Sequence, residues 1–230
     1  MPHKYVFPPP ATPQVAIARQ AARFPVHRIY CVARNYAEHA REMGMDPARD
    51  APFYFSKPAD AVIAAGGEVP VPPRTQNLHH EIELVVALGS GGRDIPVESA
   101  LDHVFGYAVG NDLTRRDLQA AAKDKGRPWD TAKGFDCSAP ITPIRPVQDI
   151  EHVASGRIWL SVNGELRQQG DIADMLYSVP EIIADLSTYY TLCAGDLIFT
   201  GTPAGVGRLV AGDRVEGGVE GLGVLTHRMV

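Results

Sequence analysis

The sequence has few cysteines, no concentrated basic segment and no long apolar run. Cys31, Cys137 and Cys193 are far apart and odd in number, and they form no C-x-x-C pair. This argues against a disulfide framework or a zinc site and favours a reducing, cytoplasmic environment. The formal net charge of -5 and the lack of a Lys/Arg cluster make us expect no nucleic-acid partner. Because no stretch approaches the roughly 18 apolar residues of a membrane helix, we also expect a soluble chain.

Length and composition indicate one ordinary globular domain. The chain has 230 residues, of which 45% are hydrophobic and 21% charged, which is enough for a single well-buried core. The first residues contain several prolines and no apolar region of a secretory signal, so we expect residues 1–25 to form an extended N-terminal arm. Residues 26–230 would then form a single domain.

The pattern of apolar and turn residues predicts a mainly β architecture with minor α, an α+β fold. The predicted strands cover residues 27–33, 53–58, 80–89, 105–113, 157–164 and 196–201, and a Gly-rich, strand-like region runs from residue 213 to the end. The predicted helices cover residues 35–44, 114–126 and 178–192, with Asn35, Thr114 and Ser178 as their expected N-terminal caps.

Two glutamates and one aspartate stand out near predicted strand ends. Glu81 and Glu83 are two residues apart, so both side chains point to the same face of a strand, and the apolar run that follows indicates a strand buried on both faces. A hard divalent cation would relieve the repulsion between two such carboxylates. Asp112, just before a predicted helix, is a third candidate ligand. Taken singly, the glutamate pair is more typical of a solvated strand face, and Asp112 of a helix cap.

The order of six short segments carries more information than any one of them. These are RNYAEHAREMG, FSKP, HHEIELVVALG, GYAVGNDLTRRDLQ, KGRPWDTAKGFD and FTGTPAGVG. Together they closely resemble the fumarylacetoacetate hydrolase family, and within it the short acylpyruvate and fumarylpyruvate hydrolases, from about Val26 onward. The resemblance implies a mixed β-roll fold, a homodimer, and Mg²⁺ or Mn²⁺ held by Glu81, Glu83 and Asp112.

The same resemblance implies which residues do the chemistry. His39 and Glu42 would orient and activate water, and their i, i+3 spacing puts them on one face of a helix. That helix would belong to a lid segment around residues 35–50. Further positions match the family's polar pocket, namely Gln119, Lys133, Arg116, Lys57 and Thr202. Without the resemblance, His39 and Lys133 would be ordinary surface residues.

The implied reaction is hydrolysis of a carbon–carbon bond in an acylpyruvate. His39, made more basic by Glu42, would deprotonate water, and the hydroxide would attack the distal carbonyl. Gln119, together with Lys133, would stabilise the oxyanion, and a pyruvate enolate would leave. Oxaloacetate decarboxylation and isomerisation or hydration of a related dioxo acid remain alternatives, as does a catalytically inactive metal-binding protein.

The expected substrate is fumarylpyruvate or a close acylpyruvate with a second carboxylate. Several cations flank the site segments, namely Arg34, Arg41, Arg115, Arg116 and Lys57. One guanidinium turned inward could pair with the distal carboxylate, and Arg34 is a candidate for that contact. For any single one of these cations, a surface or structural role is the more common one.

Overall fold

The computed structural model describes residues 5–44 and 51–230. The strands, in chain order, are β1 (Gln14–Ala16), β2 (Arg23–Pro25), β3 (Ile29–Ala33), β4 (Phe53–Lys57), β5 (Val62–Ala64), β6 (Glu68–Val69), β7 (Leu78–His80), β8 (Ile82–Leu88), β9 (Val104–Asn111), β10 (Thr114–Arg115), β11 (Ala139–Ile141), β12 (Arg145–Pro146), β13 (Arg157–Val162), β14 (Glu165–Asp171), β15 (Leu197–Phe199), β16 (Gly207–Leu209), β17 (Arg214–Val219) and β18 (Gly223–Met229). The helices are α1 (Ala37–Glu42), α2 (Arg116–Asp124), α3 (Asp130–Lys133) and α4 (Val179–Tyr189), with the 3₁₀ helices η1 (Ala59–Ala61), η2 (Val97–His103), η3 (Val147–Asp149) and η4 (Ile172–Asp174).

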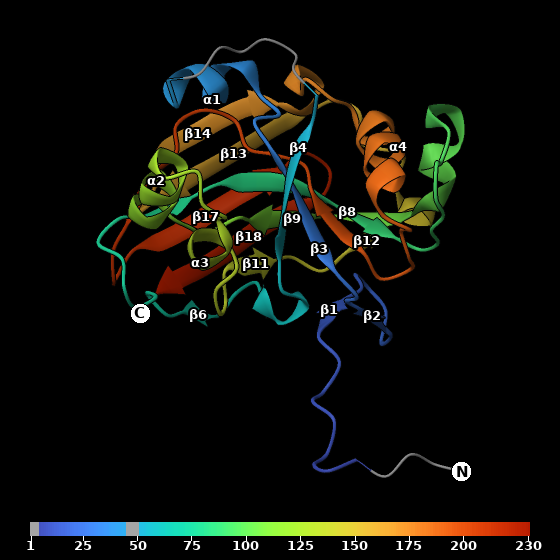
Figure 1. Ribbon diagram of the computed structural model, residues 1–230, viewed down its shortest axis with the longest axis horizontal. Coiled ribbons are helices and arrows are strands. Elements are labelled where there is room, and N and C mark those ends of the chain that lie inside the picture. The colour runs from blue at the N-terminus through green and yellow to red at the C-terminus, as the bar shows by residue number, and fades with distance from the viewer. Residues whose placement is uncertain (1–4, 45–50) are drawn as a thin grey trace.

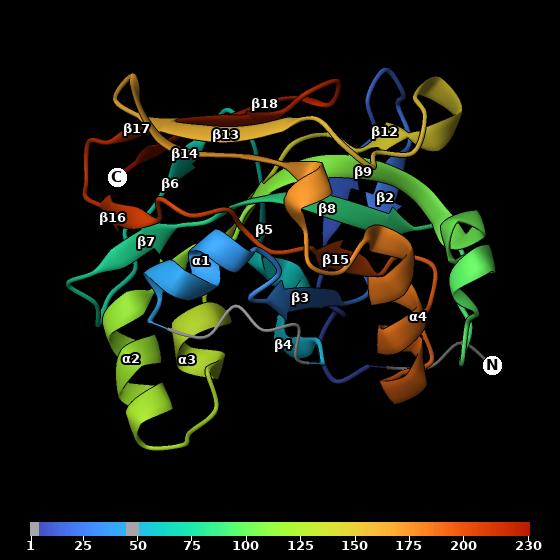
Figure 2. The ribbon, with the colours of Figure 1, turned by 90° about the horizontal axis from the view of Figure 1, so that it is seen from above.

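Two large sheets form the body of the molecule. The larger runs in the order β4-β3-β15-β8-β9-β11-β5, with β12 paired to β9, and the smaller in the order β14-β13-β17-β18-β6. Figure 2 shows the smaller sheet lying over the larger one. The predicted mainly β, α+β class is confirmed by this arrangement.

Strand β8 is buried on both faces, as its unbroken apolar sequence predicts. Leu84 and Val86 belong to the core cluster that also contains residues of β13 and β17, such as Leu160. Val85 and Ala87 belong to a second cluster on the opposite face, shared with β3 and β15. The two faces therefore anchor β8 firmly, and its first residues emerge at a fixed place.

The N-terminal segment is more integrated than a free arm. Strands β1 and β2 form a small antiparallel pair, and Val15 and Phe24 are buried in the second core cluster. Residues 5–13 form no helix or strand and extend away from the body (Figure 1). Packing of the chain therefore begins near Gln14 rather than at residue 26, because apolar side chains here alternate toward the large sheet.

Two of the three expected helix caps differ in the structure. Tyr36 and Arg115 occupy the N-cap positions of α1 and α2, and neither makes a side-chain capping bond. The Asn35 side chain binds backbone groups of distant segments instead, and Thr114 binds the carbonyl oxygen of Asp112. Ser178 does cap α4, in a capping box with Glu181. Long-range contacts thus decided the role of Asn35, whereas a local bond to Asp112 engages the side chain of Thr114.

None of the helices among the described residues is both long and apolar enough to cross a membrane.

Candidate metal centre and active site

Three carboxylates meet where strands β8 and β9 come together. The predicted strand 80–89 is broken at Glu81, which lies between β7 and β8, and Glu83 is the second residue of β8. Asp112 follows β9, and its backbone N–H donates to the carbonyl oxygen of Glu81 at 2.8 Å. The three side chains are 5%, 2% and 0% exposed. One carboxylate oxygen from each lies within 4.8 Å of the others.

Cations from helices α2 and α3 contact two of these carboxylates. Lys133, at the end of α3, donates to Glu81 Oε2 at 2.7 Å and to Asp112 Oδ2 at 2.6 Å. Arg116, at the start of α2, forms an ion pair with Glu81. Burial alone would raise the pKa of Glu81, but Lys133 and Arg116 hold it well below its usual range. Burial likewise opposes the charge of Lys133, yet Asp112 and Glu81 raise its pKa.

Glu83 differs from the other two carboxylates. It accepts a hydrogen bond from the backbone N–H of Gly201 at 2.8 Å, and no Lys, Arg or His among residues 5–44 and 51–230 forms an ion pair with it. Burial, with Asp112 and Glu81 beside it, raises the pKa of Glu83 well above its usual range. A buried acid beside two others is a favourable place for a cation, and an all-oxygen donor set suits Mg²⁺ or Mn²⁺. The residues present therefore fit such an ion.

His39 and Glu42 form the expected pair on α1. His39 Nδ1 lies 3.1 Å from Glu42 Oε2, and Glu42 Oε1 accepts the backbone N–H of Gly205 at 3.0 Å. Burial favours the neutral acid, but the bonds from His39 and Gly205 outweigh it, so the pKa of Glu42 is lowered. The carboxylate thus stays ionised and fixes the orientation of the imidazole ring.

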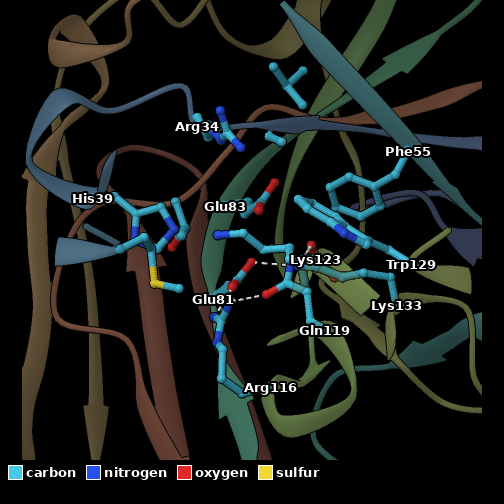
Figure 3. Close-up of a pocket in the computed structure, with 15 residues that line it drawn as sticks. Arg34, His39, Phe55, Glu81, Glu83, Arg116, Gln119, Lys123, Trp129 and Lys133 are labelled. Atoms are coloured by element: carbon cyan, nitrogen blue, oxygen red, sulfur yellow. Dashed lines mark hydrogen bonds and ion pairs between the residues drawn. The ribbon is translucent and has the colours of Figure 1, made fainter. Parts of the chain in front are cut away.

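One pocket joins the carboxylates, the histidine and the polar residues of α2 (Figure 3). Its lining consists of Val32, Ala33, Arg34, His39, Met43, Phe55, Glu81, Glu83, Asp112, Arg116, Gln119, Lys123, Trp129, Lys133 and Thr202. Arg116 donates to Gln119 Oε1. Since a guanidinium can only donate, this bond leaves the amide N–H groups of Gln119 as donors. Thr202 is held by Gln168, whose Nε2 donates to its hydroxyl at 2.7 Å.

Most of the residues singled out in the sequence line this pocket, but Arg41 and Arg115 do not. Glu42 does not line the pocket itself but contacts His39, which does. Lys57 does not line it: its ammonium group is fully buried behind Asp112, 2.8 Å from Oδ1, and donates to the carbonyl oxygens of Leu113 and Lys133. A substrate contact by Lys57 is therefore not supported, because its ammonium group is fully buried, pairs with Asp112 and donates to two backbone carbonyl oxygens outside the pocket lining. The end of the expected lid, residues 45–50, lies outside the described residues.

The sequence interpretation did not single out Lys123 or the apolar pocket residues Phe55 and Trp129. A local signal for Lys123 exists. Arg116, Gln119 and Lys123 are spaced i, i+3 and i+7, so they share one face of α2. Phe55 and Trp129 carry no comparable signal, because they are far apart in the sequence. Their ring centroids, 5.8 Å apart, come together only where β4 packs against the segment before α3.

The chain belongs to the fumarylacetoacetate hydrolase family. The family model described as fumarylacetoacetate (FAA) hydrolase C-terminal matches residues 28–230. A solved structure of fumarylpyruvate hydrolase from Pseudomonas aeruginosa, in complex with Mn²⁺ and pyruvate, is 51% identical, with a TM-score of 0.97 over 99% of each chain. A fumarylpyruvate hydrolase from Ralstonia sp is 47% identical over 77% of this chain and 92% of its own. The mitochondrial oxaloacetate tautomerase FAHD1 from Homo sapiens is 43% identical over 87% of this chain and 90% of its own.

Proposed function

We propose that this chain is a divalent-metal-dependent acylpyruvate hydrolase that cleaves fumarylpyruvate to fumarate and pyruvate. The observation that carries the proposal is the meeting of an all-oxygen acidic trio and a His39–Glu42 pair in one pocket. The similarity to fumarylpyruvate hydrolases, one of them in complex with Mn²⁺ and pyruvate, supports the substrate and the metal.

Glu81, Glu83 and Asp112 would hold Mg²⁺ or Mn²⁺. When bound, the ion supplies a Lewis acid that neutralises negative charge on the oxygens of a 2-oxo acid. Lys133 holds Glu81 and Asp112 in place through its two ion pairs, and its charge lowers the pKa of Glu81. Lys57 supports Asp112 from behind, so these two lysines orient the ligands.

His39 acts as the general base. Its Nδ1 faces Glu42, which leaves Nε2 to take a proton from water, and the ionised Glu42 stabilises the imidazolium that forms. The water oxygen bonds to the carbonyl carbon next to the double bond of fumarylpyruvate. The electrons of the carbon–carbon bond then pass to the pyruvyl part, which takes up a proton and leaves as pyruvate.

Gln119 stabilises the charge that develops on the attacked carbonyl oxygen. Arg116 fixes its amide, so its N–H groups donate into the pocket without reorganisation. Lys133 has a third N–H that can assist it. Arg34 lines the pocket at its mouth and has no ion-pair or hydrogen-bond partner in the part of the chain that the structure describes, so it is suited to meet the distal carboxylate.

A second activity, on oxaloacetate, is favoured by the similarity to oxaloacetate tautomerase FAHD1. Tautomerisation moves a proton between carbon and oxygen, and decarboxylation breaks a carbon–carbon bond without an attacking water. Both could use the same acidic trio.

A substrate panel separates these activities. The purified protein should hydrolyse fumarylpyruvate in the presence of Mn²⁺ or Mg²⁺, with kcat/KM at least ~10-fold above that for acetylpyruvate, and chelator should abolish the reaction. Oxaloacetate, followed by enol absorbance and CO₂ release, is the competing substrate. Full activity in excess chelator, or a clear preference for oxaloacetate, would overturn the proposal.

Assembly and location stay predictions. A homodimer is expected, and light scattering should report twice the mass of the chain. The described cysteines form no disulfide, which accords with a cytoplasmic location, whereas the FAHD1 relatives are named as mitochondrial.

A further inference from the structure

Two cations line the pocket in addition to those that contact the acidic trio. Lys133, Lys57 and Arg116 already contact Glu81 and Asp112. Arg34 and Lys123 both line the pocket and are both exposed at its mouth. Figure 3 shows the ammonium group of Lys123 pointing into the pocket.

We infer that Lys123, together with Arg34, binds the distal carboxylate of the substrate and thereby makes the enzyme select acylpyruvates that end in a carboxylate. This inference rests on the proposed function, which gives Arg34 a contact with the distal carboxylate, and it adds Lys123 as the second cation that selects for that end of the substrate.

The spacing along α2 supports the assignment. Gln119, proposed to bind the attacked carbonyl oxygen, and Lys123 are four residues apart, which places Lys123 about one helical turn, ~6 Å, farther along the same face. In fumarylpyruvate the carbon–carbon double bond separates the attacked carbonyl from the distal carboxylate. A substrate bound to Gln119 would therefore present its carboxylate near the Lys123 ammonium group.

The charges at the mouth also favour an anion. Burial lowers the pKa of the Lys123 ammonium group, and Arg34 and Arg116 lower it further, which means that positive charge accumulates here. A carboxylate between Lys123 and Arg34 would relieve their repulsion and form charge-assisted hydrogen bonds. The apolar side chains of Phe55 and Trp129 line the same pocket and suit the uncharged carbon chain between the two ends of the substrate.

The test compares two substrates that share the pyruvyl end. In the wild type, kcat/KM for fumarylpyruvate is divided by kcat/KM for acetylpyruvate, which has a methyl group in place of the charged end. Lys123→Met keeps the length of the side chain and removes its charge, and should lower this ratio at least ~10-fold. Lys123→Glu should lower it further, because it places a like charge beside the carboxylate.

Lys125→Met is the matched control. Lys125 follows α2, is exposed and does not line the pocket. In this variant the ratio of the two kcat/KM values should therefore stay within about twofold of wild type. An unchanged ratio in Lys123→Met, with a wild-type preference for fumarylpyruvate, overturns the inference and leaves the proposed function standing. A wild type that hydrolyses neither acylpyruvate overturns the proposed function itself.

Discussion

At the scale of single residues, the metal proposal depends most on Glu83. Its carboxylate is buried beside two others, and its pKa is raised by burial and by Asp112 and Glu81. Glu83→Gln should lower the affinity for Mn²⁺, measured by calorimetry. Because burial and the neighbouring carboxylates make ionisation of Glu83 unfavourable, and Gln cannot ionise, the variant should unfold at a higher temperature than the wild type in chelator, by about 2–4 °C for each kcal/mol gained.

The exposed Glu165, in β14, offers the control for this comparison. Glu165→Gln should change neither the Mn²⁺ affinity nor the unfolding temperature in chelator. Wild-type Mn²⁺ affinity in Glu83→Gln would remove Glu83 from the ligand set.

His39 supplies a second prediction at this scale. Since it is proposed to take the proton from water and lies outside the acidic trio, His39→Ala should lower kcat for hydrolysis at least ~10²-fold while sparing Mn²⁺ affinity. His103→Ala serves as control, because His103 binds Ser90 away from the pocket. Unchanged hydrolysis in His39→Ala would exclude the proposed base.

At the scale of elements, the position of α1 depends on the residue just before it. The buried side chain of Asn35 donates to the carbonyl oxygens of Tyr177 at 2.9 Å and Thr200 at 2.8 Å, and accepts the N–H of Tyr177 at 2.7 Å. It thus ties the start of α1 to the segment before α4 and to the end of β15. The backbone N–H of Gly201, next to Thr200, donates to Glu83, so one side chain connects α1 with the acidic trio.

Asn35→Ala should therefore cost both stability and turnover. One buried carbonyl group and two part-buried backbone groups would lose their partner, so we expect the free energy of unfolding to fall by ~2 kcal/mol or more. The turnover number should fall as well, because α1 carries His39. Thermal unfolding and hydrolysis kinetics would measure the two losses. Gln169→Ala serves as control, because the Gln169 side chain is exposed on β14. Wild-type stability of Asn35→Ala would contradict the connecting role.

The turn after β15 contributes at the same scale. Its backbone donates to Glu83 from Gly201 and to Glu42 from Gly205, so one turn contacts both the acidic trio and the catalytic pair. Gly205 has a φ of +96°, and a Cβ there would lie 2.0 Å from the carbonyl oxygen of Arg167. Only glycine fits this approach.

At the scale of the whole molecule, metal binding and folding should be coupled. The trio joins the start of β8 to the end of β9, two neighbouring strands of the large sheet. A cation that binds only the folded chain adds about 2.7 kcal/mol of stability at a hundredfold excess over Kd. Mn²⁺ should therefore raise the unfolding temperature of the wild type by several degrees and that of Glu83→Gln by much less. Equal unfolding temperatures in Mn²⁺ and in chelator would contradict this coupling.

The sequence by itself determined the features that depend on short-range periodicity. The two-residue spacing of Glu81 and Glu83 predicts that their carboxylates lie on one side, which holds although the strand is broken at Glu81. An unbroken apolar run indicates that β8 is covered on both sides. The i, i+3 spacing of His39 and Glu42 allows their contact within a single turn of α1. Order and spacing of the six segments were enough to indicate the family.

Only the tertiary structure decided which distant groups meet. Lys57 and Lys133 are separated from Asp112 by whole elements, and whether each faces the pocket or lies behind the acidic trio depends on the order of strands in the sheet. The same holds for Asn35, whose partners come from remote segments. It also holds for Lys123, because only the folded chain brings it into the same pocket as Arg34. Local sequence sets the direction of a side chain relative to its own backbone, but sheet order and packing set what it points at.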